Sequence, residues 1–289
     1  MKSFLLFLCT VIVTLNSFSI QVVTNKAHSG TNIRRIIQSL KASSSSSLKD
    51  NEFILETSSP NQLKSLLFKI AAISNRGETS SENDKLEVEK YISRLEELNP
   101  TENTVESEMI NGEWELLYSD TNLFRSSPFF MASRAICKEG KQADRFNRFC
   151  DLHRSALAHT SIGKVKQIIS PGLLTSEFET VGSVVPGLPI VVKGTIKSVA
   201  EIVSSSANDW TLQMVSTRIK EGTSNIPLFK RVLNSQRVKL PVQRLGKALE
   251  RIPIYNTPFP IFTTSYLDFD LRISRDQDNH IFVYTRVVV

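Results

Sequence analysis

The residues best suited to chemistry lie near the C-terminus, where charged and apolar residues alternate. Asp268, Asp270 and Arg272 follow Tyr266 at every second position. Residues two apart in a β-strand share one face, so we expect these polar side chains on one face of a strand, near Arg286 of the next strand. That face either points outward as a ladder of cross-strand ion pairs or points inward and hydrogen-bonds a ligand head group. Paired carboxylates are also able to work as an acid and a base.

Other sequence signals of catalysis are weak. The sequence has no Gly-rich phosphate loop, no nucleophile elbow and no His-Glu zinc motif. His153 and His159 are six residues apart, which keeps them off a common helical face. Cys137 and Cys150 are interpreted as ordinary thiols, with a disulfide in an oxidising compartment as the alternative. We therefore predict no catalytic residues, no metal and no cofactor, and we expect that the protein is not an enzyme.

The distribution of charge separates a leader from the rest of the chain. Residues 1–49 contain six Lys or Arg and no Asp or Glu, and the first acid is Asp50. The rest of the sequence has 29 basic and 29 acidic residues, so its net charge is zero. Nucleic-acid binding needs a surplus of cations on the folded domain, so this class of partner is excluded.

The leader itself has two compositions in series. Residues 1–17 contain a basic start and an apolar stretch from Phe4 to Leu15, which is typical of a signal peptide. Residues 18–50 are rich in Ser and contain basic residues, as transit peptides do. The pair predicts import through a secretory step into a plastid with additional envelopes, and a secreted protein with a Ser-rich spacer is the alternative. No later segment is apolar enough over 18 residues to span a membrane as a helix.

Hydrophobic periodicity divides the mature chain into two parts. A helical period over residues 58–100, with a break at Gly77 and a stop at Asn99-Pro100, predicts an αα-hairpin. After Pro100 the period changes to two, and turn residues separate the expected strands, which predicts an antiparallel barrel or sandwich over residues 101–289. A Pro-rich flap is expected over residues 224–260. The strand candidates are 112–118, 164–170, 174–181, 189–203, 210–220, 263–275 and 280–289.

Two of these strands carry large apolar residues at alternate positions. We expect both apolar faces to point inward around a pocket for an apolar ligand. The alternative is that both tryptophans belong to a packed hydrophobic core without a ligand pocket. The pocket candidates are Trp114, Leu116 and Tyr118 on the first strand, and Trp210, Leu212 and Met214 on the other.

The flap contains a local excess of positive charge. Residues 230–251 hold seven Lys or Arg and one acid, interleaved with Val and Leu. Such a segment either lies in a lipid interface, with its cations near anionic head groups, or forms a lid whose basic face is solvated. The candidates for membrane contact are Arg237, Lys239, Arg244 and Lys247.

Five segments in order resemble the plastid lipid-associated protein (PAP) family, also called fibrillins or plastoglobulins. The turn NRG and the stop LEELNPT come first, and the strand motif NGEWELLYS follows. GKVKQII and TTSYLDFDLRISR, the latter with its return strand IFVY, are the remaining segments. The Gly112-x-Trp114 pattern is also similar to the first strand of lipocalins. Two departures stand out: the turn Asp276–Asn279 replaces the family's usual Arg-Gly, and Phe269 replaces a polar residue.

The resemblance implies a mostly β fold, a lipocalin-like antiparallel β-barrel preceded by an N-terminal αα-hairpin. It also implies a plastid protein that binds or coats prenyl-lipids or carotenoids at a lipid-droplet or peripheral membrane surface, the plastoglobule or thylakoid. It transfers no catalytic residues. The alternative function is a soluble carrier that delivers an apolar metabolite to a plastid enzyme partner.

Overall fold

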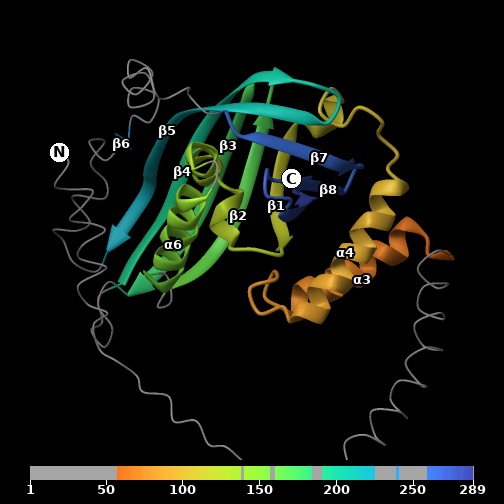
Figure 1. Cartoon of the computed structure of the whole chain (residues 1–289), viewed down its shortest axis with the longest axis horizontal. Coiled ribbons are helices and arrows are strands. Elements are labelled where there is room, and N and C mark those ends of the chain that lie inside the picture. Colours follow the sequence, from red (N-terminus) through yellow and green to blue (C-terminus); the bar gives the residue numbers. More distant parts are fainter. Residues whose placement is uncertain are drawn as a thin grey trace, which may run out of the picture. The chain divides into compact units, whose positions relative to one another are not determined.

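The computed structural model describes residues 57–137, 140–156, 160–183, 191–224, 239–240 and 259–288. The chain divides between Ser65 and Leu66 into two units, and the second, Leu66–Val289, contains the strands (Figure 1). The leader, residues 1–50, lies outside the described residues, as do the flap residues Arg237, Arg244 and Lys247.

The described strands form one antiparallel sheet that closes on itself. Its order is β4-β3-β2-β1-β9-β8-β7-β5, and a further β4–β5 pairing completes the ring. The mostly β fold and the lipocalin-like arrangement predicted from the sequence are therefore confirmed. The strands are β1 (Gly112–Ser119), β2 (Thr160–Ser170), β3 (Leu173–Ser183), β4 (Val191–Ser205), β5 (Asp209–Ser224), β6 (Lys239–Leu240), β7 (Ile261–Leu267), β8 (Leu271–Arg275) and β9 (Ile281–Arg286).

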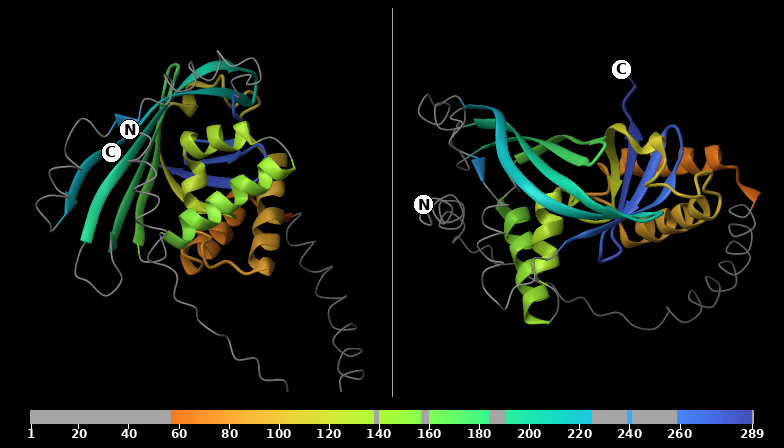
Figure 2. Two further views of the ribbon diagram at one scale, coloured as in Figure 1. Left: turned by 60° about the vertical axis from the view of Figure 1, so that its left-hand side comes forward. Right: turned by 90° about the horizontal axis from the view of Figure 1, so that it is seen from above.

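The ring is closed unevenly along its length. Strand β5 pairs with β4 from Trp210 to Ser224, but it pairs with β7 only from Asp209 to Thr211. Farther along the same edge, Thr217 and Arg218 pair with β6. The long strands β2 to β5 therefore continue as a curved sheet beyond the short strands β7 to β9 (Figures 1 and 2).

Helices precede the barrel and are also inserted into it. Helix α3 (Pro60–Ile73) crosses the unit boundary, and α4 (Glu82–Glu97) begins with a capping box in which the Ser81 and Asp84 side chains each bond the other residue's backbone N–H. Between β1 and β2, where the sequence predicted no strand, the chain forms the short 3₁₀ helix η2 (Leu123–Ser126) and helices α5 (Pro128–Ile136) and α6 (Lys141–Ala156). A further 3₁₀ turn, η1 (Glu108–Ile110), leads into β1.

Two irregularities in register separate an inner from an outer apolar layer. The β1–β9 register shifts between Leu116 and Tyr118, and the β7–β8 register shifts between Thr264 and Tyr266. Leu116 stays in the inner core, whereas Tyr118 lies opposite Val283, which is outside that core. The outer layer lies against α4, because Arg275 on that face of β8 forms ion pairs with Glu89 and Glu96.

The expected single strand from 263 to 275 is wrong. It is two strands, β7 and β8, joined by a tight turn. The Asp268 carboxylate accepts hydrogen bonds from the backbone N–H groups of Asp270 (2.9 Å) and Leu271 (2.8 Å). A side chain that bonds its own backbone two residues on is a turn-forming device, and the alternating sequence concealed it.

The NRG segment fixes the turn between α3 and α4 to the barrel. Arg76, at φ 61°, donates hydrogen bonds to the carbonyls of Gly163 (2.7 Å) and Ile162 (2.8 Å), and its own carbonyl accepts from Ser119 N (3.0 Å). Gly77 has φ +94°, and a Cβ there would lie 1.9 Å from the Ser119 carbonyl oxygen. This glycine therefore satisfies both a backbone conformation and a close approach.

We predict that Gly77→Ala lowers the free energy of unfolding by about 2 kcal/mol or more, because it combines a left-handed backbone with a clash. Gly172→Ala is the matched control, since Gly172 has φ +75° and nothing within 4 Å of the added Cβ. Chemical denaturation of both variants isolates the clash. Equal losses in the two variants would contradict the close approach.

Candidate functional site

The inner face of the barrel gathers five of the six predicted pocket residues. Trp114 and Leu116 from β1 lie in one hydrophobic core with Trp210, Leu212 and Met214 from β5, and each is buried. The Trp210 ring lies 6.5 Å from the Phe262 ring, centroid to centroid. These five side chains thus point inward, and they do so as parts of a packed core.

Tyr118 is the exception, and its predicted place in the inner face is wrong. The register shift after Leu116 turns its side chain to the outer layer, where its ring lies beside Gly77. Burial raises the pKa of the Tyr118 hydroxyl to about 12. A bulge reverses the faces of all later residues in a strand, and nothing in the alternation of residues 112–119 indicated it.

The inserted helices fill the part of the barrel in which the sequence predicted a pocket. Phe124 of η2 and Phe130 and Met131 of α5 belong to the same core as Trp114 and Trp210. The Phe124 and Phe130 rings lie 4.5 Å apart. Partly buried Phe129, Ile196 and Ile202 continue this apolar surface beyond the core.

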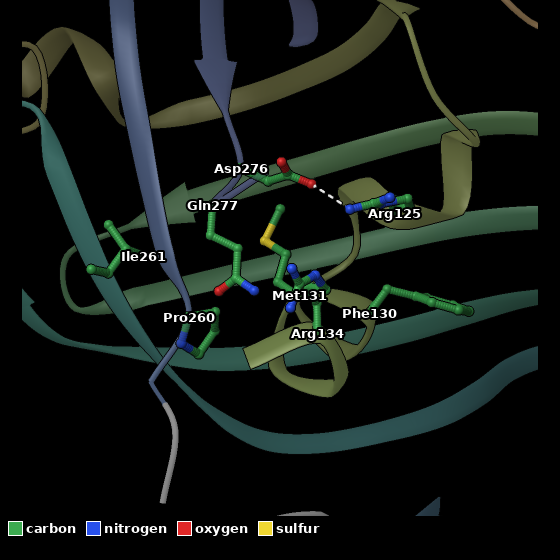
Figure 3. Close-up of a pocket in the computed structure, with 8 residues that line it drawn as sticks. All are labelled: Arg125, Phe130, Met131, Arg134, Pro260, Ile261, Asp276 and Gln277. Atoms are coloured by element: carbon green, nitrogen blue, oxygen red, sulfur yellow. Dashed lines mark hydrogen bonds and ion pairs between the residues drawn. The ribbon is translucent and has the colours of Figure 1, made fainter. Parts of the chain in front are cut away.

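Ion pairs fix η2 and α5 to the β8–β9 turn, and Figure 3 shows the one between Arg125 and Asp276. Arg125 contacts Asp276 (3.1 Å) and Asp278 (2.7 Å), and Arg134 contacts Asp278 (2.7 Å). We call these four residues the latch. Burial disfavours the charged Asp278 carboxyl, but hydrogen bonds from Arg134 and Arg125 outweigh it and lower its pKa. Sequence reasoning missed the latch, because each arginine is more than 140 residues from the aspartates that it contacts. It treated the Asp276–Asn279 turn only as a departure from the family pattern.

A small cavity and a large cleft lie beside the inserted segment. The cavity, of about 10 Å³, is bounded by the latch residues Arg125, Arg134 and Asp276 and by Met131 (Figure 3); this is space for about one water molecule. The cleft, of about 480 Å³, is lined by the α3–α4 turn, the segment after β1, α6 and His280. Its volume lies in the range of ligand pockets. Phe124 borders both the cleft and the core, so η2 lies between the two.

Arg272 lies inside the barrel and is completely buried. Its guanidinium carbon lies 4.2 Å from the centre of the Tyr284 ring and 5.5 Å from that of Trp114. Nη2 donates to Gln167 Oε1, and Gln167 Nε2 donates to the Ser126 carbonyl (2.9 Å). Burial lowers the pKa of Arg272 to about 10.

The other predicted polar residues do not share this face, so the expected common face of Asp268, Asp270 and Arg272 is wrong. Half-buried Asp268 and exposed Asp270 belong to the β7–β8 turn. Arg286 lies at the barrel end, 4.2 Å above the Trp114 ring, and donates to the carbonyls of Phe269 (2.7 Å), Asn111 (3.0 Å) and Met109. Because Asp268 and Asp270 lie in the turn and not on the inner face of a strand, they form no carboxylate pair inside the described part of the barrel.

Cys137 and Cys150 are free thiols. Burial raises the pKa of the Cys150 thiol to about 11, which keeps it protonated and unreactive at neutral pH. Within the described part of the chain, no group of three or more His, Cys, Asp and Glu side chains is arranged to hold a metal ion. Nor does any described helix have the length and apolarity required to cross a membrane.

The ring of antiparallel strands around an apolar interior defines a lipocalin-like class of protein. Residues 61–285 match the family model PAP_fibrillin, and the chain belongs to that family. It is 38% identical over 58 residues to "Probable plastid-lipid-associated protein 5, chloroplastic" of Arabidopsis thaliana, an alignment that covers 20% of this chain and 25% of the relative. The match thus spans a quarter of that relative's length. None of the solved structures matches.

We predict that the latch makes stability depend on acid pH. The pKa of Asp278 is lower in the folded protein than its unfolded value near 3.8. The stabilisation from its ion pairs is therefore fully present above that unfolded pKa, and it is lost as the pH falls through the folded-state pKa. Asp278→Asn should cost about 3 kcal/mol at pH 7, because two largely buried arginines each lose an ionised carboxylate contact, and less as the pH falls below 4. Urea denaturation between pH 2 and 7 measures this loss. The exposed Asp151→Asn is the control, and a loss that does not vary with pH would contradict the assignment.

Proposed function

We propose that this protein is a non-enzymatic, plastid lipid-associated protein that binds or coats apolar lipids, such as prenyl-lipids and carotenoids, at the plastoglobule or thylakoid surface. Membership of the PAP_fibrillin family and similarity to the plastid-lipid-associated protein of Arabidopsis support this function. The observation that carries it is a barrel whose apolar interior is filled in part by an inserted helix, on a side where the described part of β5 pairs with β7 over three residues.

Helix α5 holds the place that an apolar ligand would take. Phe130 and Met131 bury against the inner core, while α5 is fixed by side-chain interactions: the latch and a 3.3 Å hydrogen bond between Ser127 Oγ and Ser198 Oγ. A lipid chain that replaces α5 buries the same inner surface, so the exchange does not leave that surface in water. The 480 Å³ cleft beside η2 offers a place of entry.

The proposed plastid location rests first on the sequence of the leader. Its signal-like and transit-like segments favour import into a plastid, in agreement with the word "chloroplastic" in the relative's name. A fluorescent reporter fused to residues 1–50 should accumulate in plastids, and removal of Phe4 to Leu15 should leave it in the cytosol. Secretion of the intact fusion into the medium would contradict import.

We predict that weakening the packing of α5 strengthens lipid binding. Phe130→Ala should raise the apparent affinity for a polyene or prenyl-lipid probe about tenfold, because the open state becomes more populated and the apparent Kd is the intrinsic Kd divided by that population. Fluorescence titration measures the affinity. Val283→Ala, which makes a cavity in the outer layer instead, is the matched control and should leave the affinity unchanged.

A decrease in affinity in Phe130→Ala, or equal changes in the two variants, would show that the ligand does not take the place of α5. A charged substitution in the inner core, such as Trp210→Glu, is unsuited to this test. Its charge would be buried in the packed core and would unfold the protein.

The alternative function, a soluble carrier that serves a plastid enzyme, differs in where the protein resides. A coating protein should float with isolated plastid lipid particles, and replacement of Arg237, Lys239, Arg244 and Lys247 by Gln should weaken binding to anionic liposomes at low salt. Of these four, only the backbone of Lys239, in β6, belongs to the described residues. Equal binding by parent and variant would leave the flap as a lid. Recovery of the protein in the soluble fraction, with a co-purifying enzyme, would favour the carrier.

A further inference from the structure

Arg272 is a buried cation with no anionic partner among the described residues. No hydrogen-bond partner is found for its Nε and Nη1 within the described residues, and no ion pair of that part of the chain includes it. Its one hydrogen bond goes to the neutral Gln167 amide, which in turn donates to Ser126 O. The remaining polar groups on the same face of β7 and β8, Thr264 and Ser274, are hydroxyls that bond each other at 3.2 Å.

Burying the Arg272 guanidinium in this way costs folding free energy unless an anion pairs with it. A buried charge that lacks a counterion is strongly destabilising, and an arginine with a pKa of about 10 remains charged at pH 7. The rings of Trp114 and Tyr284 stabilise the guanidinium in part. Arg286, which also contacts the Trp114 ring, is partly exposed at the barrel end and interacts with Asp270. Within the described residues, the groups that contact the Arg272 guanidinium are therefore neutral.

We propose that Arg272 is the anchor for the anionic end of the bound lipid, and that this ligand is a long-chain carboxylic acid. The carboxylate would accept charge-assisted hydrogen bonds from Nε and Nη1, and the chain would lie along the inner wall formed by Leu212 and Met214. The inference rests on the proposed function, because the ligand must enter where η2 and α5 now pack.

The position of η2 supports this route. The Ser126 carbonyl that accepts from Gln167 belongs to η2, so the segment next to the anchor leads directly into α5. Displacement of η2 and α5 would release Gln167 and expose Arg272 at the base of the opened barrel. The same movement that makes room for an apolar chain thus exposes the cation that would hold its polar end.

The test compares a long-chain fatty acid with its methyl ester at pH 8, which share the chain and differ in the charge. Wild-type protein should bind the acid about tenfold or more tightly than the ester, measured by displacement of a fluorescent fatty-acid analogue. Arg272→Met should lose this preference and still bind the ester, and Arg272→Lys should retain part of it. Arg275→Met, on the opposite face of the same strand, should keep the preference.

Equal binding of acid and ester by the wild type, or a preference that survives in Arg272→Met, would overturn the anchor and leave barrel binding intact. Binding of neither probe would overturn the carboxylic acid as the ligand, and failure of the polyene or prenyl-lipid probe to bind as well would overturn the proposed function on which the anchor depends. The wild-type comparison needs no variant, so the proposal stays falsifiable even if Arg272→Met does not fold.

Discussion

The pairing of β5 on both of its edges determines the architecture of the barrel. β5 must pair with β4 along its length and with β7 at its start, since otherwise the sheet would end in exposed edges. Because β5 and β7 remain paired only as far as Thr211, the interior beyond that point needs another cover. The chain supplies η2 and α5 between β1 and β2, and the latch fixes them to the β8–β9 turn.

Much of this fold is readable from the sequence, because hydrophobic periodicity reports which face of an element is buried. The change of period after Pro100 and the turn residues between strands predicted an antiparallel barrel or sandwich, and the strand pairings form a closed ring. The side on which a residue lies was less predictable wherever the register shifts. Tyr118 continues the alternation begun by Trp114 and Leu116 and still faces outward, because an extra residue in a strand leaves no compositional trace.

The candidate site was predictable in its apolar part and not in its charged part. Trp210, Leu212 and Met214 face inward as the alternation indicated. Asp268 was expected to share a face with Arg272, yet it forms the turn that separates β7 from β8. The latch depends on a contact between segments that are distant in sequence, which no local pattern encodes.

Arg272 and Arg275 show how strongly environment distinguishes two identical side chains on one strand. Arg275 faces α4, and although burial disfavours its charge, hydrogen bonds to Glu96 and Glu89 raise its pKa. Arg272 faces the interior, where burial lowers its pKa and the described groups around it are neutral or cationic. A purely structural role would be served equally well by an apolar side chain, since replacing a buried charge by an apolar group of similar volume is often neutral or stabilising. Glu89 and Glu96 thus account for the charge of the outer arginine, whereas the described residues around the inner one supply no anion, as expected if a bound carboxylate completes the site.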